Sequence, residues 1–159
     1  MTAALDFRPI NLQRDFDACR SFRKDSWICS FQTSEGFDQA IQGYRERIAE
    51  RQTHPLWFYE HVWLNETLIG QLEYRAFSRE DGVGYVHLFY LIEQYRHQGL
   101  GSTLQRHVSA NLKAASCHSA VLSVSRTNTP ALKHYAKHGW QFMAPNPKHP
   151  MTDFYRKCL

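Results

Sequence analysis

The segment from Gly84 to Leu112 limits the possible folds more than any other part of the chain. It begins with the apolar pattern GYVHLFYLI and continues through the polar turn EQYRHQGLG. It ends in a stretch where Leu100, Leu104, Val108 and Leu112 recur every fourth residue. The first pattern is typical of a buried strand, and the last of an amphipathic helix with one apolar face. A strand that leads into such a helix predicts a mixed α/β fold with a central sheet.

The other segments extend this prediction to the whole chain. Strand and helix patterns follow in the order β-α-α-β-β-β-α-β-α-β-β, with about seven strands and about four helices. The polar pair Asn65 and Glu66 predicts a hairpin between two strands, and Asn128 and Gly139 mark the two ends of the last helix. The predicted elements are strand 5–9, helix 16–31, helix 36–52, strands 56–64, 67–77 and 84–92, helix 100–112, strand 120–125, helix 128–139, and strands 140–144 and 153–159.

Length and composition predict one domain, residues 1–159, which is long enough to bury its own core. Hydrophobic residues make up 43% and charged residues 21%, as in an ordinary soluble protein. The start MTAALDFRPI has no signal-peptide pattern, and no apolar stretch approaches the roughly 20 residues of a membrane helix. Four cysteines without C-x-x-C spacing are expected to be reduced thiols. We therefore expect a soluble, cytoplasmic protein with no membrane partner.

The charge of the chain gives weaker information about its ligands. The formal net charge is +4, which is compatible with simple solubility or with attraction of an acidic ligand. No run of Lys and Arg is long enough to predict a nucleic-acid partner.

The turn before Leu100 has the composition of an anion-binding site. Free N–H groups at the start of a helix attract anions, and glycine lets a ligand approach the main chain. Arg96, Gly99 and Gly101 supply a charge and two such glycines. A dinucleotide-binding G-x-G-x-x-G fingerprint does not fit, because Leu104 stands at the third glycine position, and no G-x-x-x-x-G-K-[ST] loop is present. The remaining alternative is a glycine turn that only caps the helix.

Two short stretches in the second half of the chain match sequence motifs of one enzyme superfamily. The stretch QYRHQGLG is similar to the signature R/Q-x-x-G-x-G/A, through Arg96, Gly99 and Gly101. The stretch NTPALKHYAKHGW is similar to the segment N-x-x-A-x-x-x-Y-x-x-x-G-[FW], and the matching residues are Asn128, Ala131, Tyr135, Gly139 and Trp140. Through these two motifs the chain resembles the GNAT superfamily of acyl-CoA-dependent N-acyltransferases. One departure is Glu93, which stands where many members have a proline after the strand.

The resemblance implies a mixed, mostly antiparallel central sheet with acetyl-CoA as the co-substrate. The strand that ends near Leu91 is expected to splay from the AVLSVS strand, and the pantetheine arm to lie in the gap. The pyrophosphate is expected on the amides between Arg96 and Ser102, and the amide arm against Asn128. The predicted cofactor-binding residues are Phe89, Tyr90, Leu91, Arg96, His97, Gln98, Gly99, Leu100, Gly101, Ser102 and Asn128.

The chemistry that the resemblance implies is direct attack of a neutral amine on the thioester carbonyl in a ternary complex. This needs an oxyanion donor, an acid for the leaving thiolate and a path for the amine proton. A main-chain N–H near Leu91 is the expected oxyanion donor, and Tyr135 the expected acid. His87 is the candidate base, with Glu73 and water as alternatives.

The acceptor is predicted only as a primary amine of a small molecule or peptide. The N-terminal helical region is expected to wall its pocket, although most of its aromatic residues should belong to the core: Trp27, Phe31, Phe37, Tyr44 and Trp57. No metal is expected, and we interpret His134 and His138 as surface residues. The competing class is a non-catalytic acyl-CoA-binding sensor on the same fold. The family and the strands near the C-terminus also predict a homodimer.

Overall fold

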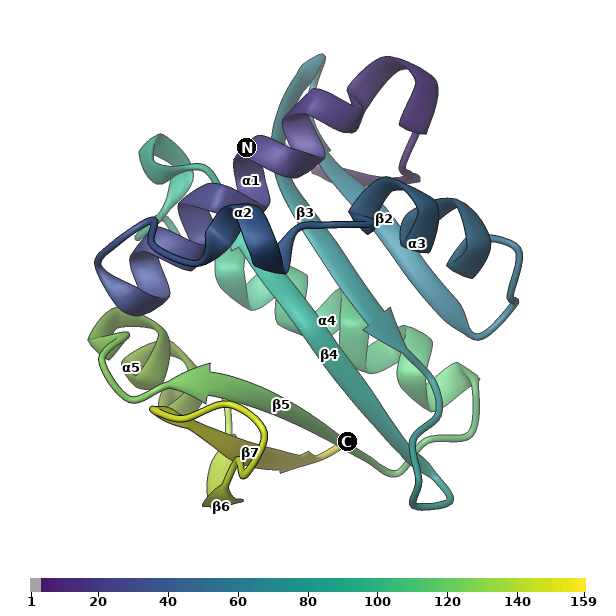
Figure 1. Cartoon of the computed structure of the whole chain (residues 1–159). Coiled ribbons are helices and arrows are strands. Elements are labelled where there is room, and N and C mark those ends of the chain that lie inside the picture. Colours follow the sequence, from purple (N-terminus) through teal and green to yellow (C-terminus); the bar gives the residue numbers. More distant parts are fainter. Residues whose placement is uncertain (1–3) are drawn as a thin grey trace.

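Seven strands form one sheet in the computed structural model, which describes residues 4–159 (Figure 1). The first three residues of the predicted domain therefore lie outside the described part. The strand order along the chain is the predicted one. The elements are β1 (Leu5–Pro9), α1 (Leu12–Phe31), α2 (Phe37–Ala40), α3 (Tyr44–Arg51), β2 (Trp57–Leu64), β3 (Thr67–Arg75), β4 (Val83–Leu91), a short 3-10 turn (Glu93–Tyr95), α4 (Leu100–Ala114), β5 (Ser119–Ser125), α5 (Thr129–Lys137), β6 (Gln141–Pro145) and β7 (Thr152–Cys158).

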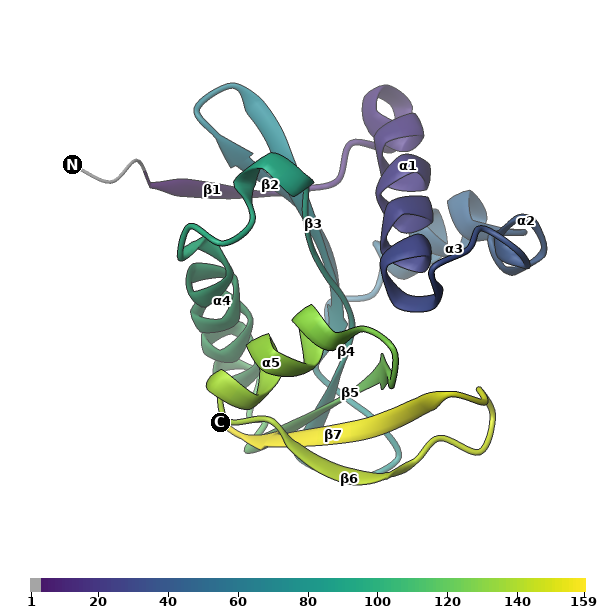
Figure 2. The ribbon, with the colours of Figure 1, turned by 90° about the vertical axis from the view of Figure 1, so that its left-hand side faces the viewer.

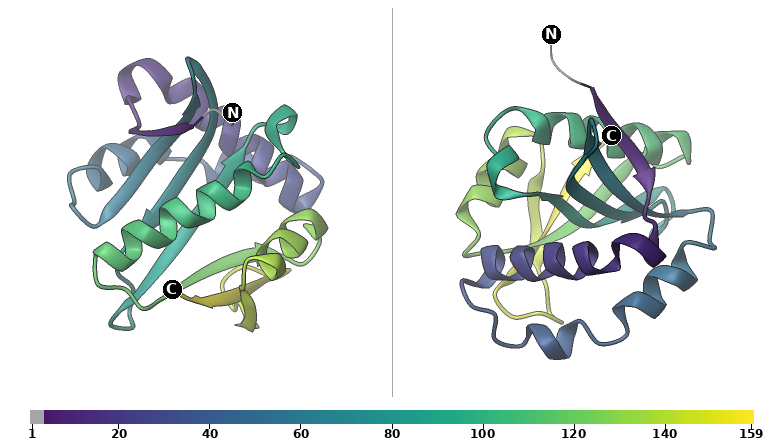
Figure 3. Two further views of the ribbon diagram at one scale, coloured as in Figure 1. Left: turned by 180° about the vertical axis from the view of Figure 1, so that it is seen from behind. Right: turned by 90° about the horizontal axis from the view of Figure 1, so that it is seen from above.

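The sheet has the spatial order β1-β2-β3-β4-β5-β7-β6. All neighbouring strands are antiparallel except β4 and β5, which are parallel and are connected by α4. Helices α1 to α3 cover one face of the sheet, and α4 and α5 cover the other (Figures 2 and 3). This confirms the mixed, mostly antiparallel α/β fold. Within residues 4–159, no helix is both long and apolar enough to cross a membrane.

The apolar stripe of α4 is the centre of the main core. Leu104, Val108 and Leu112 are almost fully buried, and they pack in one cluster with Val86 of β4 and Leu122 of β5. The four-residue spacing in the sequence therefore identified the buried face of this helix correctly.

The predicted helix 36–52 is wrong as one continuous element. The structure divides it into α2 and α3 at Gly43, which has a φ of 75°. This left-handed conformation is open to glycine and interrupts the helix. Phe37 and Tyr44 are nevertheless both buried, because the two short helices present their apolar sides to the same face of the sheet.

A β-bulge at His87 divides β4 into two parts. In the ladder with β3, Val86 lies opposite Tyr74 and Leu88 lies opposite Glu73, so His87 has no opposite residue. An extra residue of this kind bends a strand and re-aims the side chains that follow it. The second half of β4 consequently turns different residues toward each face than simple alternation predicts.

Candidate functional site

The central feature of the site is the place where β4 and β5 stop pairing. Their parallel ladder runs from Val83 opposite Ser119 to Val86 opposite Leu122 and then ends. Both strands continue beyond this point, β4 to Leu91 and β5 to Ser125, and they diverge (Figure 1). Along residues 87–91 the β5 side of β4 therefore has no strand partner. This is the gap that the family resemblance implied.

The bulge determines which groups of β4 face this gap. Tyr90 points its side chain to the α1 face, where it stacks on Phe22 at 4.9 Å between ring centroids and donates a hydrogen bond to Asp25 at 2.5 Å. Phe89 points to the opposite face, where its ring lies 6.1 Å from that of Tyr135. Of the three predicted strand residues, Tyr90 therefore turns its side chain away from α5, whereas Phe89 lies beside it.

The main chain at the start of α4 offers a row of unused donors. Gly99 is the N-cap residue with a φ of 82°, and no side chain caps the helix. The N–H groups of residues 97–99 donate to no other described group. Those of residues 100–102 lie in the first turn, where helical N–H groups have no partner within the helix. These six amides are the kind of free donors that an anion-binding helix terminus needs, and anion binding here stays a prediction.

Arg96 does not point at this helix terminus. Its Nε donates to the carbonyl of Leu91 at 2.7 Å, and its guanidinium forms an ion pair with Asp25 of α1 at 2.8 Å. Its main-chain N–H donates to Glu93. The side-chain and main-chain donors of Arg96 thus already have partners within the protein. Arg96 connects the end of β4 to α1 and is a poor candidate for direct contact with a cofactor.

Helix α5 brings two further predicted residues to the gap. Asn128 caps the helix, since its Oδ1 accepts from the N–H of Ala131 at 3.3 Å, and its Nδ2 donates to no described group. Tyr135 lies two turns later against Phe89 and Trp140, with centroid distances of 6.1 Å to each. Its hydroxyl makes no hydrogen bond with any group in residues 4–159, and burial raises its pKa, so the phenol keeps its proton at neutral pH.

Comparison with known proteins identifies this arrangement. A sequence model of the acetyltransferase (GNAT) family matches residues 16–140. The chain belongs to the GNAT acetyltransferase family. No curated protein sequence matches at a significant level.

Solved structures with the same fold include three acetyltransferases. A PaiA N-acetyltransferase from Thermoplasma acidophilum, crystallised in complex with coenzyme A, has a TM-score of 0.81 at 19% identity, over 98% of this chain and 99% of that one. An acetyltransferase from Thermus thermophilus has a TM-score of 0.78 at 17% identity, over the full length of both chains. One from Streptococcus agalactiae has a TM-score of 0.78 at 13% identity, over 99% of this chain and 100% of that one. At these identities the likeness establishes the fold alone.

The two candidate bases, His87 and Glu73, have different surroundings in the GNAT domain. His87 is half-buried, and burial together with the nearby Arg75, Arg23 and Arg51 lowers its pKa to about 3. It is therefore neutral at physiological pH but weakly basic. Glu73 is 1% exposed, and its carboxylate oxygens accept hydrogen bonds from Arg23, Tyr44 and Gln71 at 2.5 to 2.7 Å.

Gly101 serves the packing between two helices. A Cβ atom added at this position would lie 2.7 Å from Cε1 of His134 on α5. Its small size is therefore required by α5, in addition to any approach of a ligand. The interpretation of His134 and His138 as surface residues was wrong, since both are half-buried and bond to α4: Gln105 Nε2 lies 3.2 Å from His134 Nε2, and Ser102 Oγ lies 2.8 Å from His138 Nε2. Within the described residues no group of three or more His, Cys, Asp or Glu side chains is placed to hold a metal ion.

The N-terminal aromatic residues are divided between core and periphery. Phe37 and Tyr44 are buried, as expected for most of the set. Trp27 packs on Phe31 at the end of α1, with 4.9 Å between centroids. Trp57 is the first residue of β2, and its ring stacks on that of His87 on β4, with 5.2 Å between ring centroids.

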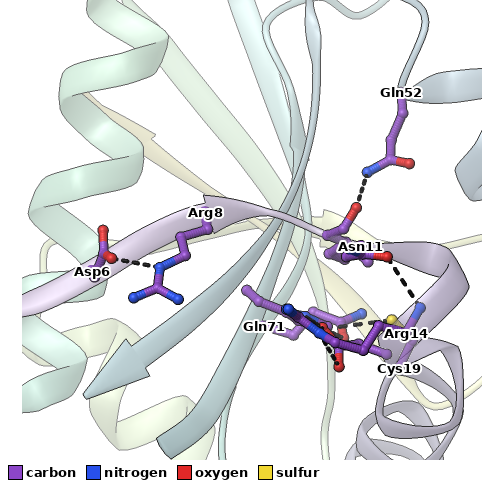
Figure 4. Close-up of polar contacts among 10 residues, drawn as sticks. Asp6, Arg8, Asn11, Arg14, Cys19, Gln52 and Gln71 are labelled. Carbon is purple, nitrogen blue, oxygen red and sulfur yellow. Dashed lines mark hydrogen bonds and ion pairs between the residues drawn. The ribbon is translucent and has the colours of Figure 1, made fainter. Parts of the chain in front are cut away.

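Sequence reasoning missed the polar groups that surround His87 and Glu73. Arg51 comes from α3 and Arg75 from the end of β3. A buried chain of hydrogen bonds also connects Gln71 to His61 and then to Cys19 beneath α1 (Figure 4). Only the alternation of polar and apolar residues in β3 hinted at these groups, and the register between strands was needed to bring them together.

Proposed function

We propose that the protein is an N-acetyltransferase that moves an acetyl group from acetyl-CoA to a primary amine of a small molecule or peptide. The observation that carries this proposal is the unpaired edge of β4 after Val86, with the unused amides of α4 at its open end. Tyr135 lies across the same gap. An extended acyl-CoA would thus find main-chain donors along its length and a phenol beside its sulfur.

Coenzyme A would bind mainly through groups that have no other partner in residues 4–159, although the carbonyl of Leu91 already accepts from Nε of Arg96. We assign its pyrophosphate to the amides of residues 97–102, because a helix terminus with free N–H groups stabilises anions. The pantetheine arm would pair with main-chain groups of Phe89 and Leu91 and with Nδ2 of Asn128. Arg96 is left out of the proposed donors, and we assign it the role of fixing the end of β4.

The reaction would proceed by direct attack. The nitrogen of a neutral amine forms a bond to the thioester carbonyl carbon, and a main-chain N–H near Leu91 stabilises the oxyanion. The C–S bond then breaks, and Tyr135 donates its proton to the departing thiolate. Since His87 is weakly basic and Glu73 is saturated with donors, we assign removal of the proton from the newly bonded nitrogen to water, and solvent returns a proton to the Tyr135 phenolate.

The test is release of free thiol from acetyl-CoA over a panel of amines, amino acids, aminoglycosides and peptides. We expect turnover with at least one class. S-acetylpantetheine, which lacks the pyrophosphate, should bind at least about tenfold more weakly than acetyl-CoA, a difference of roughly 1.4 kcal/mol. Equal binding of the two would remove the α4 terminus from the proposal. Tight acetyl-CoA binding without turnover over the whole panel would favour the non-catalytic sensor.

The assembly and the compartment are also proposals. We propose a homodimer that forms through the free edge of β6, where Phe142 and Met143 are 57% and 43% exposed. The cytoplasm remains the proposed compartment. The four cysteines are all free thiols, which is compatible with it.

A further inference from the structure

Two arginines on the α1–α3 face of the sheet surround one tryptophan. The guanidinium carbon of Arg51 lies 4.2 Å from the ring centroid of Trp57, and that of Arg75 lies 5.5 Å from it. Arg75 also lies 5.1 Å from the ring of Phe77 and 5.3 Å from the ring of Tyr85. The two side chains are half-buried and come from different elements, so this cationic cluster exists only in the folded chain.

The cationic cluster has no carboxylate partner. Neither Arg51 nor Arg75 takes part in any ion pair recorded for residues 4–159. Arg51 donates one hydrogen bond, to the hydroxyl of Tyr59 at 2.9 Å. The nearby Glu73 is already paired with Arg23. Half-buried arginines normally find an acid, so two neighbouring ones without an acid have guanidinium charge available for an anion.

Unsatisfied polar atoms point to the same place. Three buried side-chain atoms of the described residues lack a hydrogen-bond partner, and two of them are Nε of Arg75 and Nε2 of His87. His87 also stacks on Trp57. Buried polar groups are rarely left unpaired, so these two atoms need a partner that the described residues do not supply.

The cationic cluster adjoins the inner end of the gap. His87 directly follows Val86, the last residue of β4 that pairs with β5. Four residues lie between Val86 and Leu91, so these two are about 17 Å apart at the usual rise per residue. An acyl-CoA whose pyrophosphate lies at α4 would extend along this edge of β4, so an acceptor held at the cationic cluster would direct its amine along the gap toward the thioester.

We propose that Arg51 and Arg75 bind a carboxylate of the acceptor, so that the acceptor is an amine that also carries a carboxylate group. This inference rests on the proposed acetyl transfer, since it names the acceptor class for that reaction. A guanidinium offers parallel N–H donors that match the two oxygens of a carboxylate. Trp57 would lie beneath the bound group, and the amine would be directed toward the gap.

The test uses matched pairs of acceptors. A series of ω-amino acids and their carboxamides keeps the amine far from the acid, so that the pKa of the amine changes little within a pair. We expect kcat/KM to be at least about tenfold higher for the carboxylate at the best chain length, mostly through KM, as a charge-assisted hydrogen bond gives. Equal kcat/KM values for the two members at every chain length would overturn the proposal.

Variants identify the residues responsible. Arg75→Gln and Arg51→Gln should each lower kcat/KM for the carboxylate by at least about tenfold more than for the carboxamide, whereas Arg75→Lys should retain part of the preference. The matched control is Arg8→Gln, because Arg8 also lies over a tryptophan, 5.0 Å from the ring of Trp63, but belongs to β1 and pairs with Asp6 (Figure 4). A loss of preference in Arg8→Gln equal to that in Arg75→Gln would contradict the assignment.

A binding experiment separates this inference from the proposed function. Calorimetry with N-acetylated ω-amino acids and their carboxamides, on the CoA-bound protein, needs no turnover. Tighter binding of the carboxylate, lost in Arg75→Gln, supports the cationic cluster even where no amine is acetylated. Turnover without a carboxylate preference overturns the cationic cluster and leaves the proposed function intact.

Discussion

The hydroxyl of Tyr135 is a group whose removal should affect chemistry alone. It has no hydrogen-bond partner among the described residues, so Tyr135→Phe keeps the ring packing against Phe89 and Trp140 and breaks no internal bond. We expect kcat to fall by about 10²–10³, the range of general acid catalysis, with the affinity for acetyl-CoA and the melting temperature nearly unchanged. Rapid-quench kinetics would measure the chemical step. A variant with near-native kcat where chemistry limits the rate would return Tyr135 to a packing role.

The low pKa of His87, also a property of a single residue, predicts how the stability of the protein depends on pH. Its pKa is about 3 in the folded protein and about 6.5 in an unfolded chain. The unfolded chain therefore binds the extra proton between these values, and the free energy of unfolding falls as the pH drops below about 6.5. His134, with a pKa of about 4, and His61, whose pKa burial also lowers, act in the same direction.

Thermal melts between about pH 7.5 and about pH 5 would measure this effect before most carboxylates titrate. We expect the melting temperature to decrease across that window, and less steeply in His87→Gln than in the parent. His118→Gln is the control, because His118 is exposed. A melting temperature that stays constant over this range would contradict the burial of neutral imidazoles.

Among elements, the contact between α4 and α5 depends on the absence of a side chain at Gly101. An added methyl group would meet the ring of His134, which Gln105 holds in place. We expect Gly101→Ala to destabilise the protein by about 1–3 kcal/mol, as overpacking does, measured by denaturant unfolding. In a His134→Ala background the same change should cost much less. Equal costs in both backgrounds would show that His134 does not limit this position.

The elements themselves were largely predictable, because their signals are local. The stripe of α4, the Asn128 cap of α5 and the hairpin at Asn65 each depend on residues close in sequence. The bulge at His87 was not predictable, since it becomes visible only in the register with β3. The division of the second helix had a local signal in Gly43, which an apolar stripe that continued across it concealed.

For the candidate site, the predictable part was the part built from one segment. The amides of α4 follow from the glycine turn that precedes them. The partner of Arg96 is Asp25, on a helix far away in sequence, and no local pattern announces such a pair. The cationic cluster likewise combines Arg51 and Arg75 across α3 and β3, so it required the tertiary structure.

On the scale of the whole molecule, the outer edge of β6 is the surface that we propose for self-association. It lies at one end of the sheet, carries exposed Phe142 and Met143, and leaves main-chain groups without a strand partner. We expect light scattering to give the mass of a dimer, and Phe142→Lys to give a monomer that still binds acetyl-CoA. A monomeric parent protein at high concentration would exclude this interface.

The single parallel pair in the sheet also has a consequence for synthesis. Strands β1 to β4 and helices α1 to α3 precede α4 in the chain, and their ladders are antiparallel. A nascent chain leaves the ribosome from its N-terminus, so these ladders emerge before β5, but the main core also needs side chains of α4 and β5. We therefore expect Arg51, Arg75 and His87 to take their final places only when β5 docks, in the step that also forms the gap. The polypeptide would thus complete the surface that selects an acceptor and the cleft for the acyl donor together.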